Sequence, residues 1–332
     1  MNSFGKIFKI NIFGESHGPE VGVTIDGCPP GIPLSWEDFE TDLARRKSGA
    51  KGTTPRKESD TPRLISGVYQ EHTTGAPLTI LFENSDTRPD DYADFAGKPR
   101  PGHADFAAKK KYSGFNDTRG GGHFSGRITI GLVAAGVIAR KIIGPVEVKA
   151  RLVEVGGEKE IEHAVEKAIA ANDSIGGIIE CKVNQLPVGF GEPFFDSLES
   201  LISHIVFSIP GIKGVEFGAG FDSARMSGSE HNDCFVSTDG RTKTNHAGGI
   251  NGGISNGNLL VFRVAVKPTS SISKKQRTIN MTTGEMVDLE IQGRHDVCIA
   301  LRIPVIVEAV TAIVLADLFL LNHRQPVTSN KI

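Results

Sequence analysis

Two long apolar segments constrain the fold of this chain more than any other feature. Residues 128–143 and 303–321 are apolar on nearly every side of a helix. A helix of that kind has to be buried on all sides by other elements. Glu308 and Asp317 interrupt the second segment too much for a bilayer span, and the chain start lacks the apolar stretch of a secretory signal. We therefore expect two buried helices, no membrane span and a cytoplasmic protein.

Shorter patterns predict the elements around these helices. Mainly alternation of apolar and polar residues predicts strands at 8–13, 21–26, 145–154, 176–184 and 258–267. Amphipathic or alanine-rich patterns predict helices that begin after Ser35, near 158–171 and at 194–207. A polar stretch of roughly residues 84–122 is predicted to be a long loop, and loops of that length are usually functional or disordered. Because no linker interrupts these patterns, we expect one domain over residues 1–332.

Composition narrows the functional classes. The formal net charge is -2, so no basic field points to nucleic acid. The four cysteines lie far apart without a CxxC pair, and no HxxxH or HExxH motif occurs, so neither a disulfide framework nor a metal site is expected. Glycine is abundant, with 39 residues that cluster at 113–136, 211–220 and 248–257. This clustering suggests loops that face a ligand.

The stretch TRGGGHFSGR, residues 118–127, leads directly into the first apolar segment. Ser125 or Gly126 can cap the helix that follows, and a helix start offers unpaired N–H groups to an anion. Arg127 adds a planar fork that suits phosphate or carboxylate. The stretch fits neither the Walker loop nor the dinucleotide-binding fingerprint. Tight packing at a helix start remains an equally good explanation of these glycines.

Two further loops combine cations with hydroxyl groups. They are RRKSGAKGTTPRK at 45–57 and KPTSSISKK at 267–275. Such basic runs often form a solvated face, but three cationic loops in one chain suggest a ligand with several anionic groups. His17 and His103 lie beside glycines, and His295 precedes Asp296, so imidazoles could transfer protons near neutral pH. A merely structural role for these histidines is the alternative.

The motifs FGESHG, RRKSGAKGTTPRKE, RPGHAD, RGGGHFSGR, GGINGGISNG, KPTSS and QGRHD occur in this order. From about residue 4 to residue 323 the chain resembles the chorismate synthase family. The resemblance implies an α+β layered sandwich in which antiparallel sheets enclose helices, assembled as a homotetramer. It implies a lyase that eliminates phosphate from 5-enolpyruvylshikimate 3-phosphate by 1,4-anti-elimination to give chorismate. The family requires reduced FMN, without net redox change.

The resemblance also assigns roles to residues. His103 matches the histidine that protonates the departing phosphate, His17 the one that protonates reduced flavin, and Asp296 the carboxylate near flavin N5. Substrate contacts carry over onto Arg45, Arg46, Arg127 and Arg294, and a proposed NADPH contact onto Lys51. FMN contacts carry over onto His123, Phe124, Ser125, Pro210, Gly211, Gly252, Lys267, Pro268, Thr269, Ser270, Ser271 and Arg294.

The chain departs from the family at two places. Many members have GGGRSSAR where this chain has GGGHFSGR, so FMN binding here would rely on backbone N–H groups. Some members have arginine at the position of Lys51, and lysine lacks the planar fork, so NADPH is expected at most as an indirect reductant. Two alternatives stay open: a flavin-independent enzyme acting on an anionic phosphate ester, and a non-enzymatic anion- or RNA-binding module.

Overall fold

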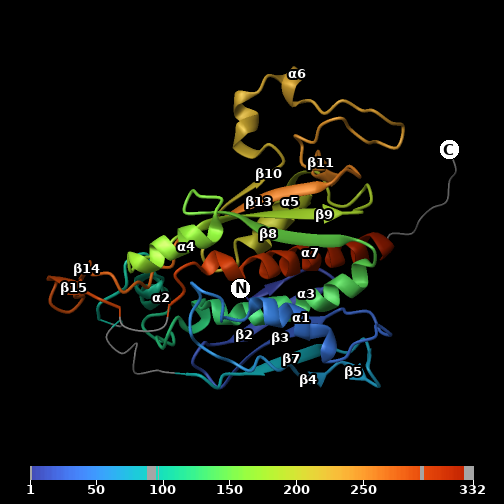
Figure 1. The fold of residues 1–332 in the computed structure, drawn as a ribbon. Coiled ribbons are helices and arrows are strands. Elements are labelled where there is room, and N and C mark those ends of the chain that lie inside the picture. The colour runs from blue at the N-terminus through green and yellow to red at the C-terminus, as the bar shows by residue number, and fades with distance from the viewer. Residues whose placement is uncertain (1, 88–94, 96, 292–294, 325–332) are drawn as a thin grey trace.

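Two antiparallel sheets enclose two long helices in the computed structural model, which describes residues 2–87, 95, 97–291 and 295–324 (Figure 1). The first sheet has the strand order β1-β2-β3-β7-β4, and the second has the order β10-β13-β9-β8. Strand bounds in the first sheet are Ser3–Phe4, Lys9–Gly14, Glu20–Asp26, Leu78–Glu83 and Arg63–Ser66. Those in the second are Ile212–Phe217, Leu260–Val266, Gly177–Asn184 and Glu147–Val155.

The buried helices are α3 (Thr129–Ile143) and α7 (Pro304–Arg324). Helix α3 packs against β2 and β3 of the first sheet, α7 packs against β8 and β9 of the second, and the two helices pack on each other (Figure 1). By length and composition Pro304–Asn322 could cross a membrane, but 78% of that window is buried inside the protein. Both predicted core helices are thus confirmed, and so is the α+β layered fold.

The two helices approach closely where Gly136 of α3 meets Ala309 of α7. A Cβ atom added to Gly136 would lie 2.4 Å from the Ala309 Cβ and 2.5 Å from its Cα. Ordinary carbon–carbon contacts are about 3.5–4.0 Å. Glycine is therefore what lets the two helix backbones approach so closely.

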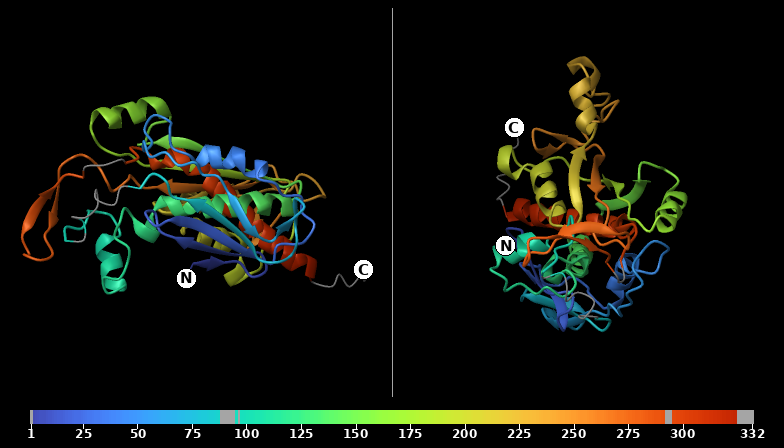
Figure 2. Two further views of the ribbon diagram at one scale, coloured as in Figure 1. Left: turned by 90° about the horizontal axis from the view of Figure 1, so that it is seen from below. Right: turned by 90° about the vertical axis from the view of Figure 1, so that its left-hand side faces the viewer.

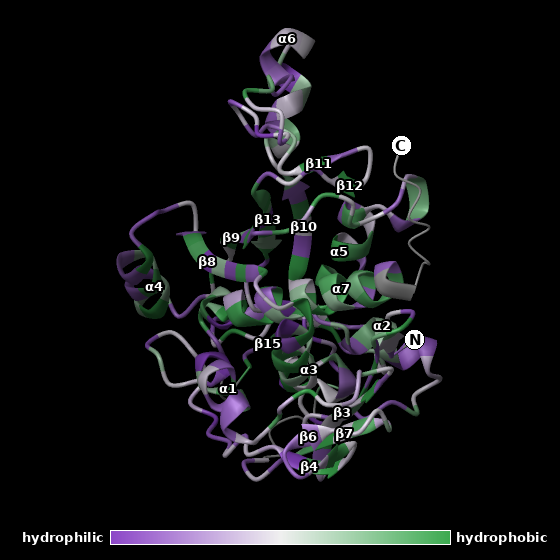
Figure 3. Cartoon of the chain, turned by 90° about the vertical axis from the view of Figure 1, so that its right-hand side faces the viewer, coloured by the Kyte–Doolittle hydropathy of each residue, from purple (hydrophilic) through white to green (hydrophobic). Residues whose placement is uncertain are grey.

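Smaller elements cover the sandwich. The helices are α1 (Glu40–Arg46), α2 (Asp105–Lys111), α4 (Ile161–Ala170), α5 (Leu198–Val206) and α6 (Gly228–His231). The two-stranded ribbons are β5–β6 (Val68–Tyr69, His72–Thr73), β11–β12 (Ile250–Asn251, Ile254–Ser255) and β14–β15 (Gln276–Ile279, Met286–Leu289). The β14–β15 ribbon and α2 lie at one end of the molecule, away from the C-terminus (Figure 2). Figure 3 shows hydrophobic colouring on α5 and α7 and more hydrophilic colouring on the projecting segment around α6.

The predicted strands and helices are present with shifts of a few residues at their ends, but the predicted loop at 84–122 is partly wrong. It contains helix α2, whose sequence DFAAKKK has an acidic residue in the first turn and three lysines in the last. Such charges complement the helix dipole, and alanine and lysine are good helix formers. The start of the helix predicted after Ser35 also differs, because a 3₁₀ turn at Glu37–Phe39 precedes α1. The Asp38 carboxylate accepts the Ser35 N–H at 2.8 Å, as a capping residue would.

Candidate active site

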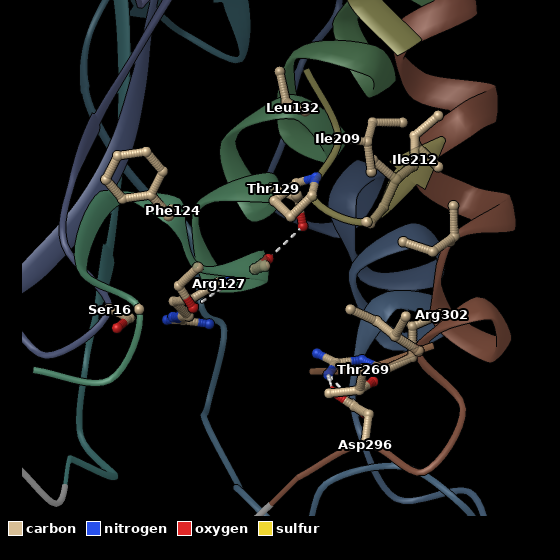
Figure 4. A pocket seen from close by; sticks show the side chains of 18 of the residues that line it. Ser16, Phe124, Arg127, Thr129, Leu132, Ile209, Ile212, Thr269, Asp296 and Arg302 are labelled. Atoms are coloured by element: carbon tan, nitrogen blue, oxygen red, sulfur yellow. Dashed lines mark hydrogen bonds and ion pairs between the residues drawn. The ribbon is translucent and has the colours of Figure 1, made fainter. Parts of the chain in front are cut away.

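A cavity of about 930 Å³ lies where α3 and α7 begin (Figure 4). Residues from both sheets' connecting loops line it, together with residues of the first turns of the two helices. The sequence-predicted residues in its lining are His17, Arg46, His103, His123, Phe124, Ser125, Arg127, Pro210, Gly211, Lys267, Pro268, Thr269, Ser270, Ser271 and Asp296. Loops that are far apart in the sequence are thus brought to one place.

The glycine-rich loop lies directly on His17. Gly120 has a φ of +65°, and a Cβ atom there would lie 2.5 Å from Cε1 and Nδ1 of the His17 ring. Only glycine fits so close to the imidazole in this backbone conformation. Ser125 accepts the Arg127 N–H at 3.2 Å and so caps the turn that leads into α3, as one of the two expected caps. The His17 side chain is buried, and the Ser16 Oγ lies 3.0 Å from its Nδ1.

His123 and Phe124 join this loop to neighbouring segments. His123 Nδ1 lies 2.7 Å from the Gly14 carbonyl oxygen, and Nε2 lies 3.2 Å from Asn2 Oδ1. The Phe124 ring lies 6.4 Å from the ring of Tyr112. The side chain of His123 is therefore engaged by β2 and the N-terminal segment, which leaves the loop backbone to face a ligand.

His103 is held by a partly buried ion pair between Arg100 and Asp105. The pKa of Asp105 would be raised by burial, but hydrogen bonds from Arg100 and His103 outweigh that effect and hold it well below its usual range. Because an ionised carboxylate only accepts hydrogen bonds, the His103 Nδ1 donates to Asp105 Oδ1 at 2.6 Å. Arg100 also donates to the Gly120 carbonyl and to Ser271 Oγ. The second ring nitrogen of His103, Nε2, is then the one available for proton exchange.

Asp60 joins two of the predicted arginines. Its Oδ2 accepts from Arg46 Nη2 at 2.7 Å, and its Oδ1 accepts from Arg127 Nη1. All three side chains are at least 96% buried. Burial would raise the pKa of Asp60, yet the charges of Arg46 and Arg127 keep it below its usual value. The site therefore holds ionised groups away from bulk water.

Arg302 extends this cationic cluster. Its Nε donates to the Arg46 carbonyl oxygen at 2.9 Å, and its Nη1 lies 3.3 Å from both oxygens of Asp296 (Figure 4). Asp296 Oδ1 also accepts the Thr54 N–H at 2.9 Å. Burial lowers the pKa of Arg46 to about 10, and Asp60 offsets part of this effect while the positive charge of Arg302 adds to it. The Arg46 Nε is buried and has no hydrogen-bond partner among the described residues.

A second cationic group contains Lys267 and Lys213. The Lys267 Nζ donates to the Gly102 carbonyl oxygen and to Ser270 Oγ, both at 2.7 Å. Burial lowers the pKa of Lys267, and the charge of Lys213 lowers it further. In the described parts of the chain neither lysine forms a salt bridge, and the buried Thr269 Oγ1 has no hydrogen-bond partner. Two unneutralised cations beside an unpaired hydroxyl favour an anionic ligand.

Comparison with known proteins agrees with this geometry. The family model described as chorismate synthase matches residues 8–320. The chain is 64% identical over 325 residues to the chorismate synthase of Chitinophaga pinensis, which covers 98% of each chain. It is 47% identical over 351 residues to that of Dehalococcoides mccartyi and 43% identical over 365 residues to that of Methanocaldococcus jannaschii, with 96% of each chain covered. The chain belongs to the chorismate synthase family.

A crystal structure of a chorismate synthase has the same fold, with a TM-score of 0.75 and 24% sequence identity over 96% of this chain and 93% of that one. Membership of the chorismate synthase family confirms the prediction of an enzyme, a lyase of the shikimate pathway that acts on a small molecule. Among the described residues, no group of three or more His, Cys, Asp or Glu residues is placed to hold a metal ion.

Three residues predicted from the chorismate synthase resemblance lie outside the cavity lining, and Arg294 lies outside the described residues. Arg45 donates to both oxygens of Glu308, at 2.6 and 2.8 Å. Since neighbouring positions on a helix point about 100° apart, Arg45 and Arg46 face different sides of α1. The exposed Lys51 pairs with Glu166 at 2.6 Å.

The third of these residues, Gly252, lies in the β11–β12 turn, where its φ is +60°. Conversely, the cavity lining contains charged residues that the sequence reasoning missed, among them Asp60, Lys213 and Arg302. Asp60 and Arg302 lie a few residues outside the predicted motifs, and Lys213 lies two residues after the predicted Gly211, so only their tertiary contacts reveal a role. The one signal that the sequence offered was Asp60, an acidic residue between the basic run at 45–57 and the next strand, which could have been predicted to pair with an arginine of that run.

Proposed function

We propose that the cavity binds 5-enolpyruvylshikimate 3-phosphate together with reduced FMN and eliminates phosphate by 1,4-anti-elimination to give chorismate. The observation that carries the proposal is the presence of two cationic groups in one cavity. One contains Arg46, Arg127 and Arg302, and the other contains Lys213 and Lys267. The substrate and FMN each carry a phosphate, so two such groups match two phosphate-bearing ligands.

The lysine group fits the phosphate of FMN. A phosphate between Lys213 and Lys267 would relieve the repulsion that lowers the pKa of Lys267, and Thr269 Oγ1 would gain a partner. Buried apolar side chains of Leu132, Ile209 and Ile212 line the same cavity and offer a wall for the flavin ring system (Figure 4). When bound, reduced FMN supplies transient electron density to the substrate. The backbone of residues 123–125 and residues 210–211 and 267–271 would hold it.

The arginine group fits the anionic groups of the substrate. Arg46 keeps an unpaired buried Nε, and Arg127 stands at the start of α3, where N–H groups favour an anion. Arg302 adds a third guanidinium. A charge-assisted, two-pronged contact of this kind binds phosphate and carboxylate strongly. These residues would fix the substrate so that the phosphate leaves toward a proton donor.

His103 is the proposed donor. Asp105 occupies Nδ1, so the imidazolium can deliver the Nε2 proton to the bridging oxygen of the departing phosphate. Such a transfer contributes about 10²–10⁴-fold to the rate. His17 is proposed to protonate the flavin, and Asp296, fixed by Thr54 and Arg302, to face its reactive nitrogen.

The test is phosphate release under anaerobic conditions, with chemically reduced FMN, with oxidised FMN and without flavin. We expect release only with reduced FMN, whereas equal release without flavin would support the flavin-independent alternative. In His103→Ala the kcat should fall roughly 10-fold or more while FMN affinity is kept. His163→Ala on the surface of α4 serves as the matched control. A parental kcat in His103→Ala would remove this residue from the mechanism.

We also propose that the protein is a cytoplasmic homotetramer of one-domain chains over residues 1–332, without nucleic-acid or membrane partners. One large cluster of buried apolar residues runs from Phe8 to Leu318, which supports a single domain. NADPH is proposed only as an indirect reductant, because Lys51 is engaged by Glu166. Arg45 and Gly252 are left out of the proposed ligand contacts of this cavity, and Arg294 stays a prediction. Light scattering at micromolar concentration tests the assembly, and a stable monomer would contradict it.

A further inference from the structure

Asp60 is a buried carboxylate to which the mechanism above gives no part. Its side chain is 1% exposed, and each of its two oxygens accepts from a different arginine of the substrate cavity. Its φ is +55°, a left-handed conformation that few residues other than glycine adopt. Aspartate tolerates it better than most residues. The backbone therefore holds the carboxylate in one place between the two guanidinium groups.

The two arginines depend on Asp60 to different degrees. Arg127 has further acceptors, with its Nε on Asn84 Oδ1 at 2.8 Å and its Nη2 on the Glu83 carbonyl oxygen at 3.0 Å. For the Arg46 side chain, Asp60 Oδ2 is the only hydrogen-bond acceptor within the described residues. Loss of the carboxylate would thus leave Arg127 anchored and set Arg46 free.

Charge balance points the same way. Arg46, Arg127 and Arg302 bring three positive charges to one region of the cavity, against the carboxylates of Asp60 and Asp296. These five groups carry one net positive charge, and the neighbouring Arg56–Glu58 pair adds none. A buried charge without a partner is costly, so the guanidinium groups need these carboxylates when no ligand is bound. Asp60 takes one N–H from each of its two arginines. Arg46 keeps its Nε and Nη1 for an anion, whereas Arg127, which also donates to Asn84 and Glu83, keeps one N–H on each of its two terminal nitrogens.

We propose that Asp60 is a positioning residue of the lyase, which fixes Arg46 relative to Arg127 so that the two guanidinium groups grip one anionic group of the substrate. The proposal rests on the proposed function, in which these arginines bind the substrate. It assigns to Asp60 no contact with the substrate and no proton transfer.

Asp60→Asn keeps the shape of the side chain but removes its charge and one acceptor. We expect kcat/KM for the substrate to fall about 10- to 100-fold, the usual effect of losing a charge-assisted hydrogen bond in a site. Binding of inorganic phosphate depends on the positive charge of the cavity more than on a fixed geometry. Asp60→Asn raises the net charge of the cavity by one unit. Its inhibition constant at saturating FMN should therefore stay equal or become lower. A purely structural role would leave the inhibition constant of the folded fraction at the parental value and restore kcat/KM once the activity is corrected for that fraction.

Asp60→Glu is the second variant, because it keeps the charge and moves the carboxylate by one methylene. We expect a lower kcat/KM with a parental inhibition constant for phosphate, which tests positioning even if Asp60→Asn does not fold. The control is Asp239→Asn, an exposed carboxylate paired with Arg241 at 3.0 Å, which should change neither value. Arg46→Ala combined with Asp60→Asn should be no worse than Arg46→Ala alone, because both remove the same element.

The outcomes separate the two proposals. If the parent protein releases no phosphate with reduced FMN, the proposed function fails irrespective of Asp60. If the parent is active and Arg46→Ala is as active as the parent, the arginine contact fails, and the role of Asp60 fails with it. If Arg46→Ala is impaired but Asp60→Asn and Asp60→Glu keep the parental kcat/KM, the positioning role alone is overturned. A weaker affinity for phosphate in Asp60→Asn would also overturn it.

Discussion

Gly136→Ala probes the contact between the two buried helices. In a helix interior this change normally stabilises by about 1 kcal/mol, because alanine loses less backbone entropy. Here the new Cβ would lie 2.4 Å from the Cβ and 2.5 Å from the Cα of Ala309. Since contacts of about 3.5 Å are needed, the helix backbones would have to separate by roughly 1 Å. Overpacking of this kind costs typically about 1–3 kcal/mol, and a clash with backbone belongs at the upper end.

We therefore expect the free energy of unfolding to fall by about 1–2 kcal/mol after the gain in helix propensity is subtracted. Urea unfolding followed by far-UV circular dichroism measures this change. Gly228→Ala in α6 is the control, since a Cβ there has no atom within 4 Å and its stability should be unchanged or slightly higher. A Gly136→Ala variant that is more stable than the parent would refute the reasoning. The variant should also lose activity, because the cavity lies between the starts of these two helices.

Three further results are expected. Asp317→Ala should lower the free energy of unfolding in urea by about 3 kcal/mol, because the Asp317 carboxylate accepts the N–H groups of residues 6–8 at 2.8, 2.6 and 2.9 Å. The control Asp196→Ala removes an exposed partner of Lys6 and should cost under about 1 kcal/mol, so equal costs would contradict this prediction. A thiol reagent should modify only Cys234 in the folded chain and all four cysteines after denaturation. The other three cysteines are buried, and burial raises the pKa of Cys28 to about 11, so fast reaction of a second thiol in the folded chain would contradict this prediction. Burial would raise the pKa of Asp105, but Arg100 and His103 keep it below its value in the unfolded chain. The stabilisation from the ionised Asp105 is therefore present above about pH 4 and lost as the pH falls further. The difference in Tm between the parent and Asp105→Asn should shrink below about pH 4, and a difference that grows there would contradict this prediction.

Local patterns predicted much of this fold, because the spacing of apolar residues within a helix or strand indicates how that element is buried. The apolar segments at 128–143 and 303–321 are α3 and α7, and the predicted strands are present. Helix α2 escaped prediction because its polar, lysine-rich residues stand among glycines and prolines. The layered arrangement itself came from the resemblance to the family, since no local pattern states which sheet covers which helix.

The site was predictable where a motif lies on the cavity and unpredictable where a contact joins distant loops. Arg45 and Arg46 are adjacent in the sequence, yet only Arg46 lines the cavity, because helix geometry turns them apart. Asp60 and Arg302 belong to no motif with a known chemistry. Their importance arises from contacts such as that between Arg302 and the Arg46 carbonyl, which spans 256 positions of sequence.

The cavity is made by two parts of the chain, each of which contributes one sheet and one buried helix. Contacts that shape it join the two parts: Thr54 to Asp296, Arg302 to Arg46, and Lys267 to Gly102. The arginine group is divided between the two parts, and the lysine group of the second part is held by the Gly102 carbonyl of the first. In refolding, helical signal can return within each part, but catalytic activity can return only after the parts have docked. Turnover is therefore a measure of the docking of the two parts, whereas the helical signal is not.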